Sequence, residues 1–100
     1  MNIEHLLPQK PDPEWNLKRA DIKDYVNLIG NLTLLSKKLN SKIGNGTIPN
    51  KIDELTNSKI PITEEVVSNL IRDKFIWNEE KIFARQKQLG IIAYNEIWDY

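Results

Sequence analysis

The tightest limit on the fold of this chain comes from an apolar run that leads directly into a capped helix. The run NLTLL, at 31–35, is short and rich in residues that favour a strand. Ser36 follows at once and is a suitable N-cap for a helix over 37–43, which Gly44 can end. The sequence therefore predicts a strand and a helix joined by a single residue.

The segment before this unit predicts one more strand and one more helix. Residues 1–7 favour a short strand, and residues 8–19, which hold three prolines, favour a loop. Apolar residues then recur at the i, i+3, i+4, i+7 spacing of a helix, at Ile22, Tyr25, Val26 and Ile29. Asp21 is a plausible N-cap for that helix, and Gly30 would end it.

Three further helices are expected after a turn at 44–50. Asn50 and Thr63 are suitable N-caps for the first two, and Asn78 begins the last and longest one. The order of a strand, a loop with a helix, a second strand and several helices predicts an α+β fold. A length of 100 residues allows one domain, which we expect to span residues 1–100.

The apolar stripe of the last helix contains one cation. Its members are Ile82, Arg85, Leu89, Ile92, Ala93 and Ile97. Because burying an unpaired charge is costly, Arg85 either pairs with a buried carboxylate, such as Asp24 or Asp53, or faces a phosphate, and we expect the carboxylate. The tryptophans are expected in the core, at Trp15, Trp77 and Trp98.

The composition excludes several classes of protein. Lysine and arginine total 14, as do aspartate and glutamate, so a site for a polyanion must be a local patch. The absence of cysteine excludes a disulfide scaffold and thiolate metal sites, and it fits a reducing compartment. No signal peptide is evident, and no apolar stretch approaches the roughly 20 residues of a membrane helix, so we expect a soluble cytoplasmic protein without membrane contact.

The two predicted strands and the helix after them carry a histidine and two asparagines. His5, the only histidine, lies beside Glu4 on the first strand; Asn31 begins the second strand, and Asn40 lies nine positions later on the helix. Each has a plainer interpretation when taken alone: a structural histidine, a solvent-facing acid, a turn residue and an ordinary polar helix residue. Together they make a ββα unit that carries His, Asn and Asn.

This unit resembles the HNH, or His-Me finger, nucleases. More narrowly, the chain resembles the C-terminal nuclease domain of GmrSD-like modification-dependent restriction enzymes. The resemblance covers nearly the whole chain and rests on IEHLLPQ at 3–9, GNLTLLS at 30–36, Asn40, Lys51, Ser58, Trp77, Ile82, Arg85, Leu89 and Trp98. It implies a ββα-metal core with a short two-stranded hairpin, surrounded by additional helices.

The resemblance implies a general base and a metal site. In the family, the histidine at the position of His5 is the general base, a role that suits an imidazole because its ordinary pKa lies near ~6.5. The residue at the position of Asn40 binds one divalent metal, and an amide oxygen is a hard ligand suited to Mg²⁺ or Mn²⁺. Glu4 would add a carboxylate ligand, where many relatives have the shorter aspartate. Neighbouring strand residues face opposite sides, so Glu4 and His5 serve one site only if the strand end twists.

The resemblance also implies residues that support catalysis and contact the substrate. Asn31 would tie the long loop together through hydrogen bonds to the backbone and so fix the strand that carries His5. Three lysines flank Asn40, and they are either a solvated helix face or contacts for a phosphate backbone: Lys37, Lys38 and Lys42. The expected function is that of a metal-dependent DNA endonuclease in a restriction or anti-phage defence system, which leaves 5′-phosphate and 3′-hydroxyl ends.

A second hypothesis belongs to another class: a non-catalytic nucleic-acid-binding or protein-interaction module that retains the HNH scaffold. The neutral net charge favours it mildly. So does the fact that only four residues precede His5 to build the first strand. Members of the family usually carry a large N-terminal domain that uses nucleotides and senses modified DNA. The chain would then be the C-terminal part of a larger system, with such a domain or subunit as its partner.

Overall fold

Two short antiparallel strands form the sheet of this protein. The computed structural model describes the backbone of residues 1–98 and the side chains of residues 1–90. Strand β1 (Asn2–His5) pairs with β2 (Leu32–Leu35), and the register places Glu4 opposite Thr33 and His5 opposite Leu32. Both strands lie within or close to the ranges that the sequence predicts. The strands and the five α-helices of the described residues make an α+β fold, as expected.

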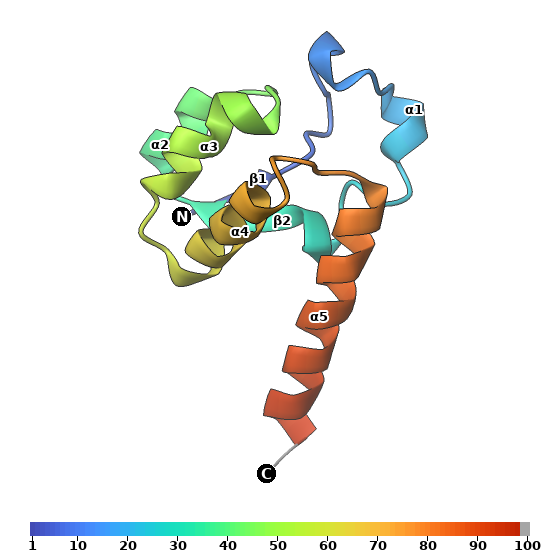
Figure 1. Cartoon of the computed structure of the whole chain (residues 1–100), viewed down its shortest axis with the longest axis vertical. Helices are drawn as coiled ribbons and strands as arrows, with labels where there is room; N and C mark the ends of the chain where they lie inside the picture. The colour runs from blue at the N-terminus through green and yellow to red at the C-terminus, as the bar shows by residue number, and fades with distance from the viewer. Residues whose placement is uncertain (99–100) are drawn as a thin grey trace.

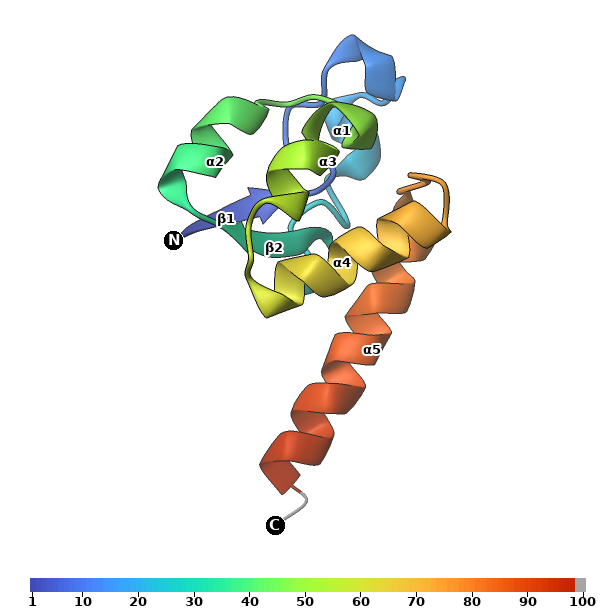
Figure 2. The same ribbon diagram turned by 60° about the vertical axis from the view of Figure 1, so that its left-hand side comes forward.

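Helices cover one face of the sheet. Helix α2 (Lys37–Ile43) contacts β1 and α3 (Ile48–Thr56), α3 contacts α4 (Pro61–Arg72), and α4 contacts β2 (Figure 2). The strands alternate accordingly: Glu4 and Thr33 are buried under these helices, whereas Ile3 is 61% exposed on the other face. The sheet therefore presents successive residues of β1 to two different environments.

The junction between β2 and α2 forms as the sequence predicts. The Ser36 hydroxyl accepts a hydrogen bond from the Leu39 backbone N–H at 3.2 Å. At the other end, Gly44 caps the helix with φ of +63°, a backbone conformation that a residue without a Cβ adopts readily. These local signals fix both ends of α2, so the sequence alone was sufficient here.

The predicted helix over 22–29 is wrong. The chain forms a short 3₁₀ turn η1 (Pro13–Trp15), a single turn of helix α1 (Arg19–Ile22), and a second 3₁₀ turn η2 (Ile29–Asn31). In a continuing helix the Gly30 N–H would donate to the Val26 carbonyl. Instead, Gly30 donates to Gln86 Oε1 at 2.7 Å and the Val26 carbonyl accepts from Asn31 Nδ2 at 2.8 Å. Side-chain partners have replaced this helical hydrogen bond, and Ile29 is 57% exposed.

Three of the predicted N-caps lie inside helices instead, and one of them is Asp21, which lies within α1. Helix α3 begins after Thr47 and α4 begins after Ile60, each with a proline in its first turn, where the missing N–H costs nothing. Asn50 is therefore within α3. Thr63 is buried within α4, and its hydroxyl donates to the Leu34 carbonyl at 2.6 Å, so it joins α4 to the sheet.

The last helix, α5 (Glu79–Trp98), begins where the sequence predicts. Asn78 Oδ1 accepts a hydrogen bond from the Lys81 N–H at 3.0 Å. The helix packs against η2 and then runs away from the rest of the domain (Figure 1). No helix among the described residues is long and apolar enough to span a bilayer. The predicted stripe positions Ile92, Ala93 and Ile97, and the predicted core residue Trp98, lie outside the described side chains.

Arg85 is buried, but the partner expected for it is wrong. Its Nη1 donates to the backbone carbonyls of Leu32 at 2.7 Å and Gly30 at 3.0 Å. Its partners among the described residues are thus carbonyl oxygens and not Asp24 or Asp53. Burial lowers the pKa of this guanidinium from its ordinary value. The arginine holds the turn that leads into β2, with its charge stabilised by peptide dipoles.

The core consists of two apolar clusters. One lies between the sheet and helices α2 to α4, with Leu6, Leu35 and Leu55 among its members, and the other gathers around Leu7 and Ile82. Trp15 and Trp77 are half-buried and pack against both clusters, as expected of core residues. The two tryptophans therefore join the clusters into one core.

The close approach of η2 to α5 predicts a specific effect of a methyl group at Gly30. A Cβ there would collide with the Ile82 carbonyl and would lie 2.8 Å from the Gln86 backbone nitrogen. Because neither is a flexible side chain, Gly30→Ala should lower the free energy of unfolding by about 1–3 kcal/mol or more, measured by urea denaturation. Gly90→Ala is the matched control, since a Cβ at Gly90 meets nothing within 4 Å; it should raise stability by up to about 1 kcal/mol. Equal stability of the two variants would contradict the packing of η2 on α5.

Candidate active site

The only histidine lies at the end of β1 and is held by an amide. His5 is half-buried, and its Nε2 lies 3.0 Å from Asn27 Oδ1, which also accepts a hydrogen bond from Gln9 Nε2 at 2.9 Å. Since an amide oxygen can only accept, Nε2 of His5 carries the proton and donates. In a neutral imidazole the other ring nitrogen, Nδ1, then keeps its lone pair. The arrangement leaves His5 with one oriented nitrogen that can accept a proton.

Asn31 is fully buried, and its side chain makes four hydrogen bonds. Oδ1 accepts from the Leu7 N–H at 2.8 Å and from Trp77 Nε1 at 2.9 Å, and Nδ2 donates to the carbonyls of Leu7 and Val26 at 2.8 Å each. These bonds use both donors and both lone pairs of the amide. Asn31 thus clamps the chain two residues after His5. It holds the strand in place and has no exposed surface with which to meet a substrate.

Glu4 and Lys51 form a buried pair beneath the sheet. Lys51 is completely buried on α3, and its Nζ lies 3.7 Å from Glu4 Oε2. The same ammonium donates to the carbonyls of Leu6 at 2.8 Å and His5 at 3.2 Å. Burial raises the pKa of the Glu4 carboxyl, while the ammonium of Lys51 acts in the opposite direction. Lys51 therefore fixes the backbone of the very residue that carries the imidazole.

Asn40 lies on α2 and is half-buried. Its Oδ1 is 3.5 Å from Asn2 Nδ2, the limit of a hydrogen bond, so this oxygen is weakly engaged. Within the described part of the chain, no hydrogen bond or ion pair joins Asn40 to His5 or Glu4. Glu4 stays on the helix-covered face of β1, whereas His5 is the next residue and contacts Asn27. The structure thus brings His5 to Asn27, Glu4 to Lys51 and Asn40 to Asn2.

The oxygen donors present are of the kind that a divalent cation takes. Glu4 Oε2 is buried without a hydrogen-bond partner among the described residues, and Asn40 Oδ1 is only weakly engaged. Both are hard donors suited to Mg²⁺ or Mn²⁺, which complete their shells with water and substrate. The described residues contain no group of three or more histidine, cysteine or acidic side chains that could hold a metal. A cation here would therefore rely on few protein ligands, with Lys51 close to one of them.

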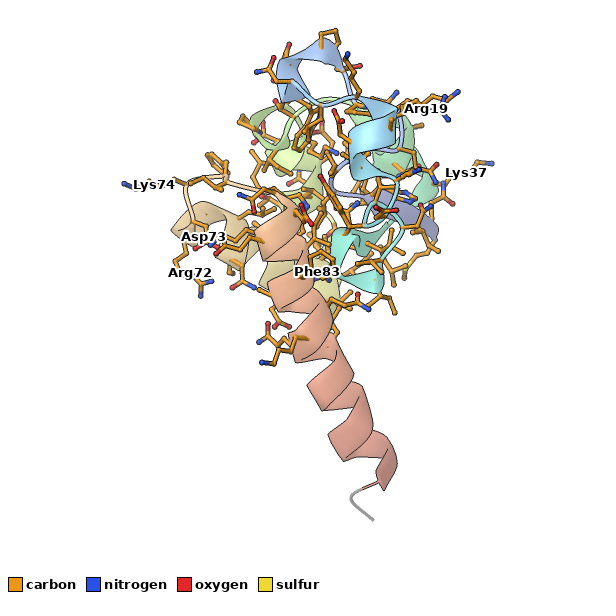
Figure 3. All side chains as sticks on the ribbon, turned by 90° about the vertical axis from the view of Figure 1, so that its right-hand side faces the viewer. Arg19, Lys37, Arg72, Asp73, Lys74 and Phe83 are labelled. Carbon is orange, nitrogen blue, oxygen red and sulfur yellow. The ribbon has the colours of Figure 1, made fainter. Side chains whose placement is uncertain are left out.

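The three lysines expected to meet DNA are exposed on α2: Lys37, Lys38 and Lys42. Figure 3 shows Lys37 extending outward from the body of the domain. The pattern of lysines around Asn40 is thus compatible with either a solvated face or a phosphate contact.

Sequence reasoning missed the residues that hold the site together. The sequence did not mark Asn27 as a site residue, because it is an ordinary polar residue within a predicted helix. Trp77 was assigned to the core by its size alone, although a buried indole N–H usually needs an acceptor. Lys51 did carry a signal: it occupies an apolar stripe with Ile48 and Leu55 on α3, all three buried.

The buried pair of Glu4 and Lys51 predicts a pH-dependent loss of stability. Lys51→Met would leave the Glu4 carboxylate without its cation and two carbonyls without a donor, so unfolding at pH 7.5 should become easier by about 3–5 kcal/mol. Protonation of Glu4 removes the buried charge, and its folded-state pKa is raised, so the destabilisation should shrink as the pH falls through that raised pKa towards 4.5.

Urea denaturation of Lys51→Met at pH 7.5 and pH 5 measures this effect. The double variant Lys51→Met, Glu4→Gln is the control, because it removes the charge at every pH and should recover part of the loss. A loss that is the same at both pH values would show that Glu4 is not the stranded group.

Comparison with known proteins identifies the family of this chain. Residues 1–91 match the family described as GmrSD restriction endonucleases, C-terminal domain. Neither the curated proteins nor the solved structures include a match to the chain. Because the matched residues make up most of the chain and include His5, Asn31 and Asn40, the chain belongs to the family of C-terminal domains of GmrSD restriction endonucleases, which indicates a function of the restriction-endonuclease type.

Proposed function

We propose that this chain is an endonuclease domain of the HNH type that hydrolyses DNA phosphodiester bonds with His5 as its general base. The observation that carries the proposal is the oriented imidazole: His5 ends β1 and donates from Nε2 to Asn27, and among the described residues no hydrogen bond engages Nδ1. Membership of an endonuclease family supports a phosphodiester substrate. The domain would act in restriction or defence, as the C-terminal part of a system that also includes a nucleotide-using sensor domain or subunit.

We assign the ββα-metal core of this nuclease to β1, β2 and α2. Two features support the assignment: β2 passes into α2 through Ser36 alone, and α2 returns to contact β1. This topology carries His5 on the first strand and Asn40 on the helix. Asn31, directly before β2, supports the core from inside through its four hydrogen bonds.

In the proposed reaction His5 Nδ1 removes a proton from the attacking water. The imidazolium that forms keeps its Nε2–H bonded to Asn27 Oδ1, which holds the ring in one orientation and stabilises the new charge. Lys51 and Asn31 fix the backbone of His5 and of the residues that follow it, so the ring meets the water without reorganisation of the strand.

Asn40 and Glu4 are the residues that would hold the divalent metal of this site. When bound, the metal supplies positive charge to the scissile phosphate and to the leaving oxygen. The buried Oε2 of Glu4 has no hydrogen-bond partner among the described residues but lies 3.7 Å from Lys51 Nζ, so a metal would compete with that ammonium for the oxygen. Lys37, Lys38 and Lys42 extend from the same helix as Asn40 and would contact phosphates.

His5→Ala should abolish nicking of supercoiled plasmid while the domain stays folded. Loss of a general base lowers the rate by about 10²–10⁴-fold, and a half-buried side chain at a strand end contributes little to packing. The assay is conversion to nicked circle in Mg²⁺ and in Mn²⁺, with a thermal melt to establish folding. Nicking by His5→Ala at the wild-type rate would remove His5 as the base. A wild-type protein inert with both ions would favour the non-catalytic binding module.

Asn40→Ala should weaken metal binding specifically. The variant loses an oxygen ligand but keeps the lysines, so a higher metal requirement with unchanged DNA affinity is expected. Mn²⁺ binding followed by electron paramagnetic resonance measures this without any cleavage. Asn40→Asp is the matched control, because a carboxylate is also a hard donor and should restore binding. Wild-type Mn²⁺ affinity in Asn40→Ala would exclude Asn40 as a ligand.

A further inference from the structure

A positively charged groove lies beside the candidate base. It has a volume of about 490 Å³ and runs between the segment after β1 and helix α1. Three of its lining residues are cations, Lys10, Arg19 and Lys23, and two more are the amides Gln9 and Asn27; the lining contains no acidic side chain. In a chain with 14 charges of each sign, this is a local excess of positive charge.

The cations of the groove have no internal counter-charge among the described residues. All three are exposed, and in that part of the chain none of them lies within ion-pair distance of a carboxylate. Elsewhere on the surface the situation differs: Arg72 and Lys81 both pair with Asp73, at 3.3 and 3.4 Å. The groove is thus positively charged and open, whereas the cluster around Asp73 is partly neutralised.

The groove is joined directly to His5. Gln9 and Asn27 belong to its wall, they are hydrogen-bonded to each other, and Asn27 Oδ1 is the acceptor for His5 Nε2. In Figure 3, Arg19 and Lys37 lie at the same edge of the domain, and Lys74 lies at the opposite edge. A polyanion in the groove would therefore have its nearest phosphates close to the imidazole.

We propose that this groove binds the phosphodiester backbone of the DNA substrate, with phosphate contacts from Lys10, Arg19 and Lys23. The inference rests on the proposed function for its ligand, and it adds α1 and the preceding loop to the lysines of α2 as sites of phosphate contact. Three exposed cations release counterions from DNA when they meet phosphates, and that release drives binding. The groove would direct the DNA backbone towards His5. Gln9 and Asn27 lie between the groove and the imidazole.

The test is DNA binding by the triple variant Lys10→Gln, Arg19→Gln, Lys23→Gln. Fluorescence anisotropy with a labelled duplex, in EDTA so that no cleavage occurs, gives the affinity over a series of salt concentrations. The variant should bind roughly tenfold more weakly or worse at low salt. Its salt dependence should be shallower by about 0.9 in log–log slope for each phosphate that the variant no longer neutralises.

A control variant removes the same charge from elsewhere: Lys59→Gln, Lys74→Gln, Lys87→Gln, three exposed lysines outside the groove. It should keep nearly the wild-type affinity and slope. Equal losses in the two triple variants, or a groove variant with wild-type binding, would overturn the groove as the DNA site. So would a wild-type protein that does not bind DNA.

Nicking by the same proteins separates the two proposals. A wild-type protein that binds DNA through the groove but does not nick it would contradict the proposed catalytic function and leave the groove supported. A wild-type protein that nicks DNA, with a groove variant of unchanged affinity and salt slope, would support the proposed catalytic function and contradict the groove as the DNA site.

Discussion

The side chain of Asn31 is the interaction on which the rest of the structure depends. One amide joins three segments far apart in the sequence: the chain after β1 at Leu7, the turn before β2 at Val26, and the approach to α5 at Trp77. All of its hydrogen-bonding capacity is used inside the core, where an unsatisfied amide would be costly. The two strands can pair as they do because this side chain fixes the loop between them.

Two buried cations, like Asn31, join segments that are far apart in the sequence. Lys51 donates to the carbonyls that end β1, and Arg85 donates to the carbonyls that lead into β2. Each long side chain reaches from a helix to backbone oxygens at the ends of the strands. The charges inside this small core therefore have a structural role, and one of them also lies against Glu4.

The functional proposals follow from the different surroundings of the two faces of β1. Glu4 faces the helices, within reach of Lys51, and the next residue, His5, turns towards Asn27 and the basic groove. Proton transfer and DNA binding are thus assigned to the side of β1 that carries His5. Because successive side chains of a strand point in opposite directions, Glu4 would reach a metal at the scissile phosphate only if the end of β1 twists.

The sequence by itself determined those parts of the protein that depend on local signals. Both strands, the Ser36 cap, the Gly44 stop and the Asn78 start of α5 involve neighbours a few residues apart, and motifs such as IEHLLPQ and GNLTLLS carried the resemblance to the family. Only the tertiary structure decided the course of residues 22–29 and the partners of Arg85, Lys51 and His5. Each of these depends on a donor and an acceptor from distant segments. Every residue carries a backbone carbonyl, so the sequence does not indicate which carbonyls accept hydrogen bonds from a buried cation.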